Sequence, residues 1–332
     1  MNRFAIASPK TFKEAGELLV DKRFTLPMLK AGGMDVLDHM KEGLYEPDVL
    51  INIKRLKLES GPSVSVVSGS IRIEAGATLA EIAASKIIQE EAPVVGQATD
   101  SAATPQVRNV ATAAGNLLQR PRCWYYRNVE FNCLKKGGDR CYAVEGENKY
   151  HAIFGDGPCH IVHPSNLAPA LMVCDGTVHV IGGTRKSISI ESLFHMPSKG
   201  VSDENTLEKG EVVTHITLKP AAKSGFYVVK EKQSFDWPLV LACVSLELDG
   251  DTIKSARVCA GAVAPTPWML PKVAEALKGI KVSDDAGLRK AAALSTEGAK
   301  PMSGNAYKLK LLPVAIRRAV LKALGQNPEP VA

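Results

Sequence analysis

Four cysteines lie close together in a chain that contains only seven. Residues 122–159 read RCWYYRNVEFNCLKKGGDRCYAVEGENKYHAIFGDGPC, with nine, seven and seventeen residues between Cys123, Cys133, Cys141 and Cys159. Four thiolates can hold an iron–sulfur cluster or a tetrahedral zinc ion. They can also pair as disulfides or pack as small apolar side chains. The spacers are too long for a stand-alone metal signature, so the spacing leaves these alternatives open.

The rest of the composition limits which class of protein carries these thiols. At 332 residues and 45% hydrophobic, the chain can bury the cores of two or three domains. Its net charge of +6 is modest and no basic block stands apart from acids, which disfavours nucleic-acid binding. With no long apolar run and no signal-peptide pattern, we expect no membrane span and a cytoplasmic location, unless a partner carries an export signal. In a reducing cytoplasm, clustered cysteines are more often metal ligands or redox groups than disulfides.

The N-terminal residues are predicted to form a small βαβ unit. TFKEAGELLVD, from residue 11, has apolar residues at helical spacing behind a threonine that can cap the helix. FTLPMLKAGGMDVLDHM then runs from a strand through paired glycines into a second helix, and DVLINI at 48–53 is typical of a strand. We assign residues 1–56 to a first subdomain.

Further strands and turns follow, with a break near residue 220. SVSVVSGSIRIEAGATLAEIAAS (63–85) alternates apolar and polar residues and then becomes helical. Asp175-Gly176 within ALMVCDGTVHVIG predicts a hairpin, and EVVTHITLK (211–219) predicts a strand. The polar KPAAKSG at 219–225 marks a boundary, so 57–220 and 221–332 are expected to be separate units of an α+β chain. Beyond the boundary we expect a second Asp-Gly hairpin within 241–265 and helices at 271–279, 284–295 and 312–324.

Two loops rich in small residues can bring the backbone close to a ligand. LKAGGMDVL (29–37) places paired glycines between a strand and a helix, where backbone N–H groups favour an anion such as pyrophosphate. VRNVATAAGNLL (107–118) brings small residues together before Asn116, whose amide can donate and accept hydrogen bonds. Either loop alone is more often an ordinary tight turn, and neither matches the dinucleotide fingerprint or a Walker motif.

Taken together, five motifs resemble one protein family. They are KAGGMDVL (30–37), ATPQVRNVATAAGNL (103–117), HPSNLAPAL (163–171), AGAVAPTPW (260–268) and PMSGNAYKLKLLPVAIRRAV (301–320). Their content and order are similar to the FAD-binding subunit of the molybdenum hydroxylases, a family that includes xanthine dehydrogenase and carbon monoxide dehydrogenase. The resemblance spans nearly the whole chain. It implies a two-subdomain FAD-binding fold of the vanillyl-alcohol-oxidase (PCMH) type in 1–56 and 57–220, and an α+β flavoprotein domain with a small antiparallel sheet and helices in 221–332.

The resemblance also implies which residues hold FAD. The two loops would hold the pyrophosphate between the two subdomains. Asn166 lies where relatives usually carry Asp, so it can reach the ribose or adenine side without a negative charge. Val228 lies where many relatives have a lysine near the flavin, so we do not expect that lysine to tune the flavin here. The implied cofactor-binding set is Lys30, Ala31, Gly32, Gly33, Met34, Asp35, Val36, Thr112, Ala113, Ala114, Gly115, Asn116, Leu117, Asn166 and Val213.

The clustered cysteines fit the same resemblance. Flavin subunits of the hydroxybenzoyl-CoA reductase and periplasmic aldehyde oxidoreductase types carry an inserted loop that binds a [4Fe-4S] cluster, and most other members lack this segment. The resemblance therefore implies an insert at about 122–160 whose cluster ligands are Cys123, Cys133, Cys141 and Cys159. Nearby basic residues can offset the charge of a cluster or form an ordinary solvated face: Lys135, Lys136 and Arg140. The other cysteines lie in apolar, strand-like runs and are expected to be small buried side chains: Cys174, Cys243 and Cys259.

The implied function is electron transfer. FAD exchanges one or two electrons, so it can couple iron–sulfur clusters to a two-electron acceptor. The resemblance implies a large molybdenum-cofactor subunit that acts on the substrate and a small subunit with two [2Fe-2S] clusters. Ferredoxin, quinone, NAD and oxygen are all open as the external donor or acceptor. The alternatives are a self-sufficient FAD oxidase with its own substrate pocket, and a zinc-stapled assembly protein without flavin.

Overall fold

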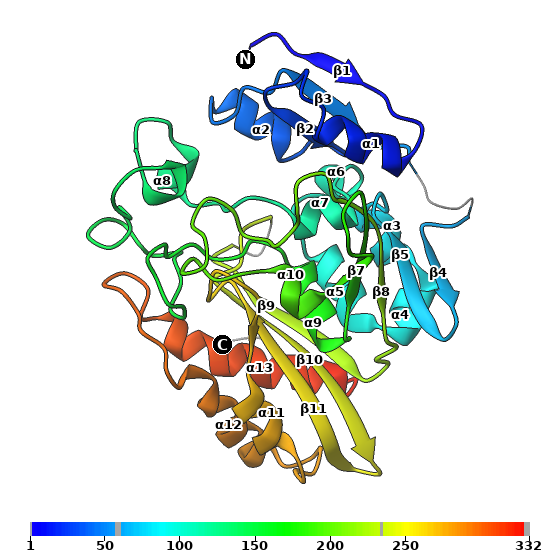
Figure 1. Ribbon diagram of the computed structural model, residues 1–332. Coiled ribbons are helices and arrows are strands. Elements are labelled where there is room, and N and C mark those ends of the chain that lie inside the picture. The colour runs from blue at the N-terminus through cyan, green and yellow to red at the C-terminus, as the bar shows by residue number, and fades with distance from the viewer. Residues whose placement is uncertain (1, 57–60, 233–234, 329–332) are drawn as a thin grey trace.

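The computed structural model describes residues 2–56, 61–232 and 235–328. Figure 1 shows an N-terminal sheet at one end of the molecule, a central sheet with its helices, and a C-terminal sheet with helices at the other end. The mixture of strands and helices throughout confirms the α+β class expected from the sequence. The expected junction between residues 56 and 57 falls at residues 57–60, outside the described residues.

The N-terminal unit is a parallel sheet flanked by helices, as its βαβ pattern predicts. Its elements are β1 (Ala5–Ala7), α1 (Phe12–Leu19), β2 (Pro27–Lys30), α2 (Val36–Lys41) and β3 (Val49–Asn52). The strands pair in the order β1-β3-β2, and both pairs are parallel. Helix α1 begins where the Thr11 hydroxyl accepts the backbone N–H of Glu14, which satisfies a free donor of the first turn. Phe12 and Ile51 pack with Val212, which joins this unit to the central sheet.

The central unit is an antiparallel sheet packed against helices. Its strands are β4 (Val64–Val67), β5 (Ser70–Glu74), β6 (Thr177–Ile181), β7 (Ser187–Ser189) and β8 (Val212–Leu218). Its helices are α3 (Leu79–Ala84), α4 (Lys86–Glu91), α5 (Pro93–Asp100), α6 (Pro105–Arg108), α7 (Ala113–Leu117), α9 (Leu167–Val173) and α10 (Ile190–Leu193). The strands pair in the order β4-β5-β8-β6-β7, so the strand expected at 211–219 lies in the middle of the sheet. Apolar side chains such as Ile71, Ile82 and Leu171 fill the core between the sheet and the helices.

The hairpin expected at Asp175-Gly176 is wrong. The apolar run before it forms α9, and every residue of that helix is buried. A helix that is buried on all sides has no polar face, so its sequence cannot be told from that of a buried strand by periodicity. Asp175, with φ at 51°, turns the chain from α9 into β6. Cys174 therefore follows a helix rather than lying in a strand, although it is buried as expected.

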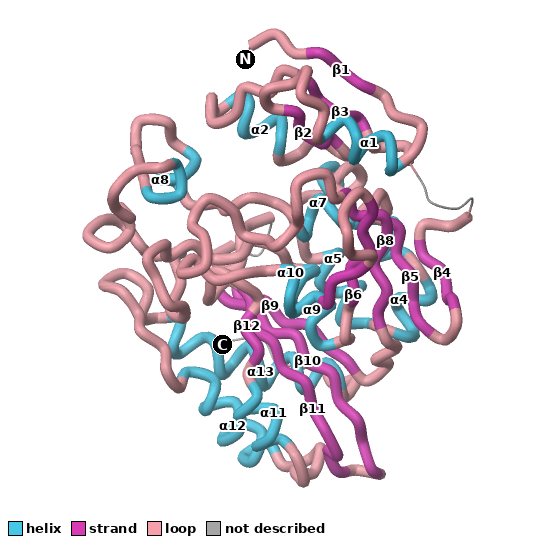
Figure 2. Tube along the Cα trace, in the orientation of Figure 1, coloured by secondary structure: helices cyan, strands magenta, loops and turns pink. Residues whose placement is uncertain are grey.

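Residues 121–166, all of them described, are mostly irregular loop (Figure 2). The regular pieces within them are α8 (Trp124–Arg127) and the 3-10 turn η1 (Leu134–Lys136). The end of this loop is fastened to the C-terminal part of the chain. The buried Lys308 ammonium donates to the carbonyls of Tyr150, His151 and Ala262, at 3.3, 2.9 and 2.7 Å. These bonds satisfy buried carbonyls that have no partner in a sheet or helix.

The C-terminal unit is an antiparallel sheet covered by helices. Its elements are β9 (Ser224–Val229), β10 (Val240–Asp249), β11 (Thr252–Gly261), β12 (Trp268–Met269), α11 (Pro271–Leu277), α12 (Asp285–Ala293), the 3-10 turn η2 (Leu294–Thr296) and α13 (Lys308–Ala323). The strands pair in the order β12-β11-β10-β9, and the predicted hairpin at Asp249-Gly250 is confirmed. The three predicted helices are also confirmed, and the last begins earlier, at Lys308. Within the described ranges, no helix has both the length and the apolar character that crossing a bilayer requires.

Candidate flavin pocket and thiol cavity

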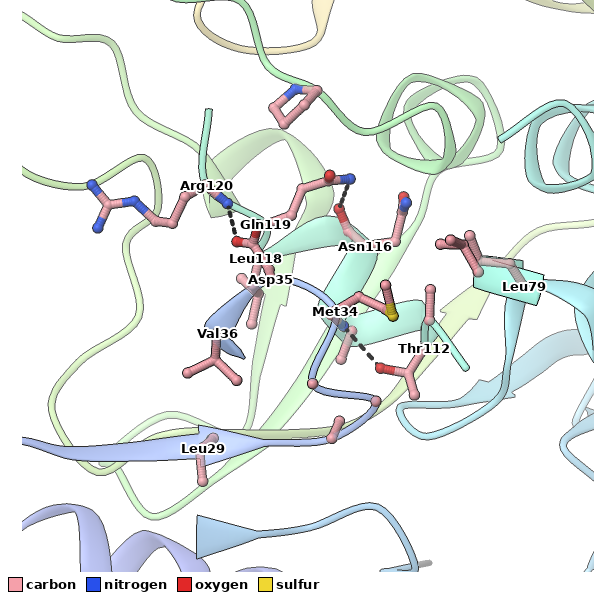
Figure 3. A pocket seen from close by; sticks show the side chains of 18 of the residues that line it. Leu29, Met34, Asp35, Val36, Leu79, Thr112, Asn116, Leu118, Gln119 and Arg120 are labelled. Carbon is pink, nitrogen blue, oxygen red and sulfur yellow. Dashed lines mark hydrogen bonds between the residues drawn. The ribbon is translucent and has the colours of Figure 1, made fainter. Parts of the chain in front are cut away.

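A cavity of about 500 Å³ lies where the two glycine-bearing loops meet, between the N-terminal and central units. Figure 3 shows side chains from both loops around it. The loops approach closely, because a Cβ on Gly32 would lie 2.1 Å from the carbonyl oxygen of Val110. Any side chain at position 32 would push the loops apart, so glycine is required there. We call this cavity the flavin pocket, after the cofactor that the sequence led us to expect.

The structure brings most of the expected cofactor-binding residues to the wall of the flavin pocket. These are Ala31, Gly32, Gly33, Met34, Asp35, Val36, Thr112, Ala114, Gly115, Asn116, Asn166 and Val213. Three others do not line it. Lys30 ends strand β2, and Ala113 and Leu117 are buried in the core behind the second loop. Residues 113 and 117 are four apart on α7, so they share one face of that helix, and it is the face turned away from the cavity.

Two amide side chains on the pocket wall are fixed by hydrogen bonds. The Asn116 side-chain oxygen accepts from the Ser165 hydroxyl at 2.6 Å, which ties the second loop to the segment that carries Asn166. The Asn166 amide nitrogen donates to the Ser101 hydroxyl at 3.2 Å. Both amides therefore have a defined orientation before any ligand is bound.

The pocket also includes residues that sequence patterns do not indicate. Arg120 and Arg122 both line the pocket and closely follow the second loop in sequence. That closeness to the loop is the feature of the sequence that could have indicated them. Trp237 comes from the C-terminal unit and carries no local signal. This residue is 49% exposed, and the Arg122 guanidinium lies 5.0 Å from the centre of its ring. This cation–π contact places an aromatic ring at the edge of the pocket.

Asp35, at the start of α2, carries a carboxylate that binds several groups from the segment after the second loop. Its carboxylate accepts the backbone N–H of Arg120 at 2.8 Å (Figure 3). It also pairs with Arg122 at 2.9 Å and with Arg127 at 2.8 Å. Burial acts to raise the pKa of Asp35, but Arg122, the Arg120 amide and Arg127 outweigh burial and hold that pKa below its usual value. The carboxylate thus stays ionised and ties the two loops together.

A second, smaller cavity is lined by all four clustered cysteines, and we call it the thiol cavity. Its walls are Cys123, Tyr125, Tyr126, Cys133, Leu134, Lys135, Cys141, Tyr142, His151, Cys159 and Ile161. The space left between these side chains is only about 10 Å³. All seven cysteines, each within the described ranges, are free thiols, so the insert is not held by disulfides. The three cysteines outside the insert are buried elsewhere, as expected.

The thiols of Cys123, Cys141 and Cys159 differ in how readily they ionise. A hydrogen bond from Cys159 lowers the pKa of Cys141 to about 5, and the same bond raises the pKa of Cys159. Burial raises the pKa of Cys123 to about 11, and His151 Nε2 lies 3.3 Å from the Cys123 sulfur. Of the pair Cys141 and Cys159, Cys141 therefore ionises more readily, and the thiolate is the form that binds metals.

The three basic residues that the sequence suggested could offset the charge of a cluster, Lys135, Lys136 and Arg140, make different contacts. Lys135 lines the thiol cavity, but its ammonium pairs with the buried Glu204 carboxylate at 2.5 Å. Lys136 donates to the Asn128 carbonyl, and Arg140 lies over the Tyr142 ring at 4.7 Å. Only Lys135 of the three is placed to act on a group inside the cavity.

Comparison with known proteins agrees with the resemblance seen in the motifs. The chain matches the family described as "FAD binding domain in molybdopterin dehydrogenase" over residues 2–220, and the "CO dehydrogenase flavoprotein C-terminal domain" over residues 225–323. It is 34% identical to the aldehyde oxidoreductase FAD-binding subunit PaoB of Escherichia coli (strain K12), over 72% of this chain and 76% of PaoB. It is 25% identical to the carbon monoxide dehydrogenase medium chain of Hydrogenophaga pseudoflava, over 96% of each chain.

Solved structures show the same fold. A chain of quinoline 2-oxidoreductase from Pseudomonas putida 86 superposes with a TM-score of 0.74 at 21% identity, covering 98% of both chains. A chain of reconstituted CO dehydrogenase from Oligotropha carboxidovorans gives a TM-score of 0.75 at 21% identity, covering 98% of this chain and 99% of that one. Because these solved structures are only 21% identical to this chain, they establish its fold alone. The match to the family model and the 34% identity to PaoB establish its family. The chain belongs to the family of FAD-binding subunits of the molybdopterin dehydrogenases.

Proposed function

We propose that this chain is the electron-transfer subunit of a molybdenum-containing oxidoreductase, with FAD in the flavin pocket and a [4Fe-4S] cluster in the thiol cavity. The observation that carries the proposal is the convergence of two sets of residues. Loops about 80 residues apart in sequence meet around one pocket, and four cysteines spread over residues 123–159 line one cavity. Both occur in a chain that carries the FAD-binding domain of this family.

The flavin pocket fits a dinucleotide by its chemistry. Small residues at 31–33 and 112–115 leave backbone N–H groups open to a pyrophosphate. Asn116 and Asn166 offer fixed amides to a ribose or an adenine, and apolar side chains such as Leu79 and Val213 can cover the faces of the rings. When bound, FAD supplies one- and two-electron chemistry. The chain's own part is to bind, orient and shield the cofactor.

The thiol cavity fits a metal group by its donor set. Four cysteines that line one cavity are the ligands that an iron–sulfur cluster takes, and PaoB, a relative at 34% identity, is an aldehyde oxidoreductase subunit. In the described residues, no group of three or more His, Cys, Asp or Glu side chains is already arranged to hold a metal ion. Because the open space is about 10 Å³, the cysteine side chains must move apart to take up a cluster. The cysteines lie in loop, which permits that movement.

The partners follow from the family and from the relatives' names. The carbon monoxide dehydrogenase relative is called a medium chain, and the family is that of molybdopterin dehydrogenases. We propose a large molybdenum-cofactor subunit that converts the substrate and a small subunit whose [2Fe-2S] clusters exchange electrons with this chain. The external partner is ferredoxin, quinone, NAD or oxygen, and the complex acts in the cytoplasm unless a partner directs its export.

The test is the cofactor content of the protein purified without oxygen. We expect one FAD and about four iron and four sulfide ions per chain. A yellow, iron-free protein would remove the cluster from the proposal. A colourless protein with one zinc per chain would establish the zinc-stapled alternative instead.

Co-purification tests the partners. A tagged chain produced in its native host is expected to bring down a large molybdenum-containing chain and a small chain rich in cysteine. Turnover of a small alcohol by the isolated chain would support the self-sufficient oxidase and contradict the subunit assignment.

A further inference from the structure

The flavin pocket and the thiol cavity share a wall. Tyr45 lines the flavin pocket and Tyr126 lines the thiol cavity, and their hydroxyl oxygens are 3.0 Å apart. Arg120 donates to the Tyr45 hydroxyl at 2.6 Å, and its guanidinium lies 5.1 Å from the centre of the Tyr126 ring. His39, on α2, stacks on Tyr45 with the ring centres 5.2 Å apart. A side chain that lines one cavity therefore contacts a side chain that lines the other.

An ion-pair network crosses the same wall. Arg127, whose side chain is 9% exposed, pairs with Asp35 at 2.8 Å, Asp38 at 2.8 Å and Glu42 at 3.2 Å. All three carboxylates lie on or next to α2, which leads directly from the first glycine loop. Arg122 also pairs with two of these acids, with Asp35 at 2.9 Å and with Asp38 at 3.7 Å. Arg127 is thus the one of these two arginines that pairs with all three acids, and its positive charge offsets theirs beside the pocket.

Arg127 is also connected to the thiol cavity through the backbone of α8. Arg127 ends α8, and this single turn begins directly after Cys123, whose carbonyl accepts the Arg127 backbone N–H at 2.9 Å. A helix of one turn does not hold its own shape in water. The position of α8 is therefore set by its anchors, which are Cys123 and Tyr126 at the thiol cavity and Arg127 at α2.

We propose that Arg127 is a positioning residue that couples the two sites, so that filling the thiol cavity strengthens flavin binding. With a metal group bound, Cys123 would hold the start of α8 in place, α8 would hold Arg127, and Arg127 would keep α2 and the first glycine loop in the shape that accepts the pyrophosphate. The inference rests on the proposed function, because the coupling ligand is the cluster. Such coupling is reciprocal, so flavin also strengthens retention of the cluster.

The test compares the affinity for FAD in iron-loaded and iron-depleted full-length protein. FAD dissociation constants are measured without oxygen by flavin fluorescence titration of the wild type, Arg127→Met and Arg127→Lys. Removing the iron is expected to weaken FAD binding by the wild type about tenfold, within the range usual for coupled sites. Arg127→Met is expected to weaken binding about tenfold in the loaded protein and to lose the dependence on iron. Arg127→Lys, which keeps the charge, is expected to recover part of that dependence.

The matched control is Arg257→Met. Arg257 pairs with Asp175 and Glu191 at 2.9 and 3.0 Å, and it lines neither cavity. This variant should keep the tenfold effect of iron, which separates coupling from a general loss of stability.

Two outcomes overturn the inference, and they are distinguishable. Equal FAD affinity with and without iron in the wild type, or an unchanged iron effect in Arg127→Met, overturns the coupling alone. A wild-type chain that binds FAD but never takes up iron overturns the cluster in the proposed function, and the coupling with it. The wild-type comparison needs no variant, so the inference stays falsifiable even where a substitution prevents folding.

Discussion

The flavin pocket and the thiol cavity are built in opposite ways. The flavin pocket is bounded by regular elements and by the backbone of small residues, and it is open at about 500 Å³. The thiol cavity lies in irregular loop, is lined by rings and thiols, and is nearly closed at about 10 Å³. A site built from backbone is present before its ligand arrives, whereas a site built from loop side chains collapses on itself until it is filled. The two sites should therefore respond to different kinds of substitution.

The largest expected effect is loss of iron when a cysteine of the thiol cavity is replaced. Cys133→Ala removes one of four ligands, so iron per chain should fall to below about a tenth of the wild-type value. Cys243→Ala, which removes a buried thiol outside both cavities, should keep its iron. Elemental analysis of both variants checks this, and full iron content in Cys133→Ala would remove that residue from the ligand set.

A pair of glycine variants should separate the two sites. A Cβ on Gly32 would lie 2.1 Å from the Val110 carbonyl oxygen, and a Cβ on Gly138 would lie 1.8 Å from that of Asn132. Overpacking of this kind costs roughly 1–3 kcal/mol, so Gly32→Ala should weaken FAD binding about tenfold to a hundredfold. Gly138→Ala distorts the turn between two cysteines, so it should reduce iron content and weaken FAD binding only by the roughly tenfold that the coupling transmits.

Measuring FAD affinity and iron content in Gly32→Ala, Gly138→Ala and a control glycine variant checks which cavity holds which cofactor. Gly61→Ala is the control, because a Cβ there would meet nothing within 4 Å. If Gly32→Ala lost iron and kept full affinity for FAD, the two cavities would have been assigned the wrong way round.

Lys308 tests how the insert is held to the C-terminal unit. Lys308→Met leaves the carbonyls of Tyr150 and Ala262 without the Lys308 donor, whereas the His151 carbonyl keeps the Asn305 amide, and each unsatisfied group has a cost. The free energy of unfolding should fall by about 3 kcal/mol in urea titrations. Lys272→Met removes only an exposed ion pair with Glu297, so it should change that free energy by less than about 1 kcal/mol. Equal effects of the two variants would contradict a structural role for Lys308.

The smallest expected effect is a pH dependence at Asp35. Its pKa is lowered in the folded state, so its contribution to stability is complete above the pKa of an unfolded aspartate and disappears as the pH falls through the folded value. The difference in Tm between the wild type and Asp35→Asn should be steady between about pH 6 and 8 and should shrink below about pH 4. Thermal denaturation across this range measures it. A difference that grows as the pH falls would show that the sign is wrong.

Much of the fold could be predicted because its signals are local. The caps, alternations and Asp-Gly turn that mark α1, β8 and the β10–β11 hairpin each lie within about ten residues. Helix α9 was missed because its burial on all sides removes the helical period on which such a prediction depends.

The site could be predicted only as far as its motifs extend. The two glycine loops and the four cysteines were visible as residue types, and the family resemblance placed them together. The wall between the two cavities was not visible. Its contacts join Asp35 to Arg127 and Tyr45 to Tyr126, which are 92 and 81 residues apart in sequence, and no local pattern records such pairs. Trp237 was missed for the same reason, because it reaches the pocket from another unit.

The most direct test of the account is an anomalous diffraction map, collected at the iron edge, from crystals of the chain purified and kept without oxygen. The account predicts one strong iron signal within bonding distance of the sulfur atoms of Cys123, Cys133, Cys141 and Cys159, and density for one FAD against Gly32, Gly33 and the 112–116 loop. A signal at the zinc edge alone, or FAD density away from both glycine loops, would contradict it.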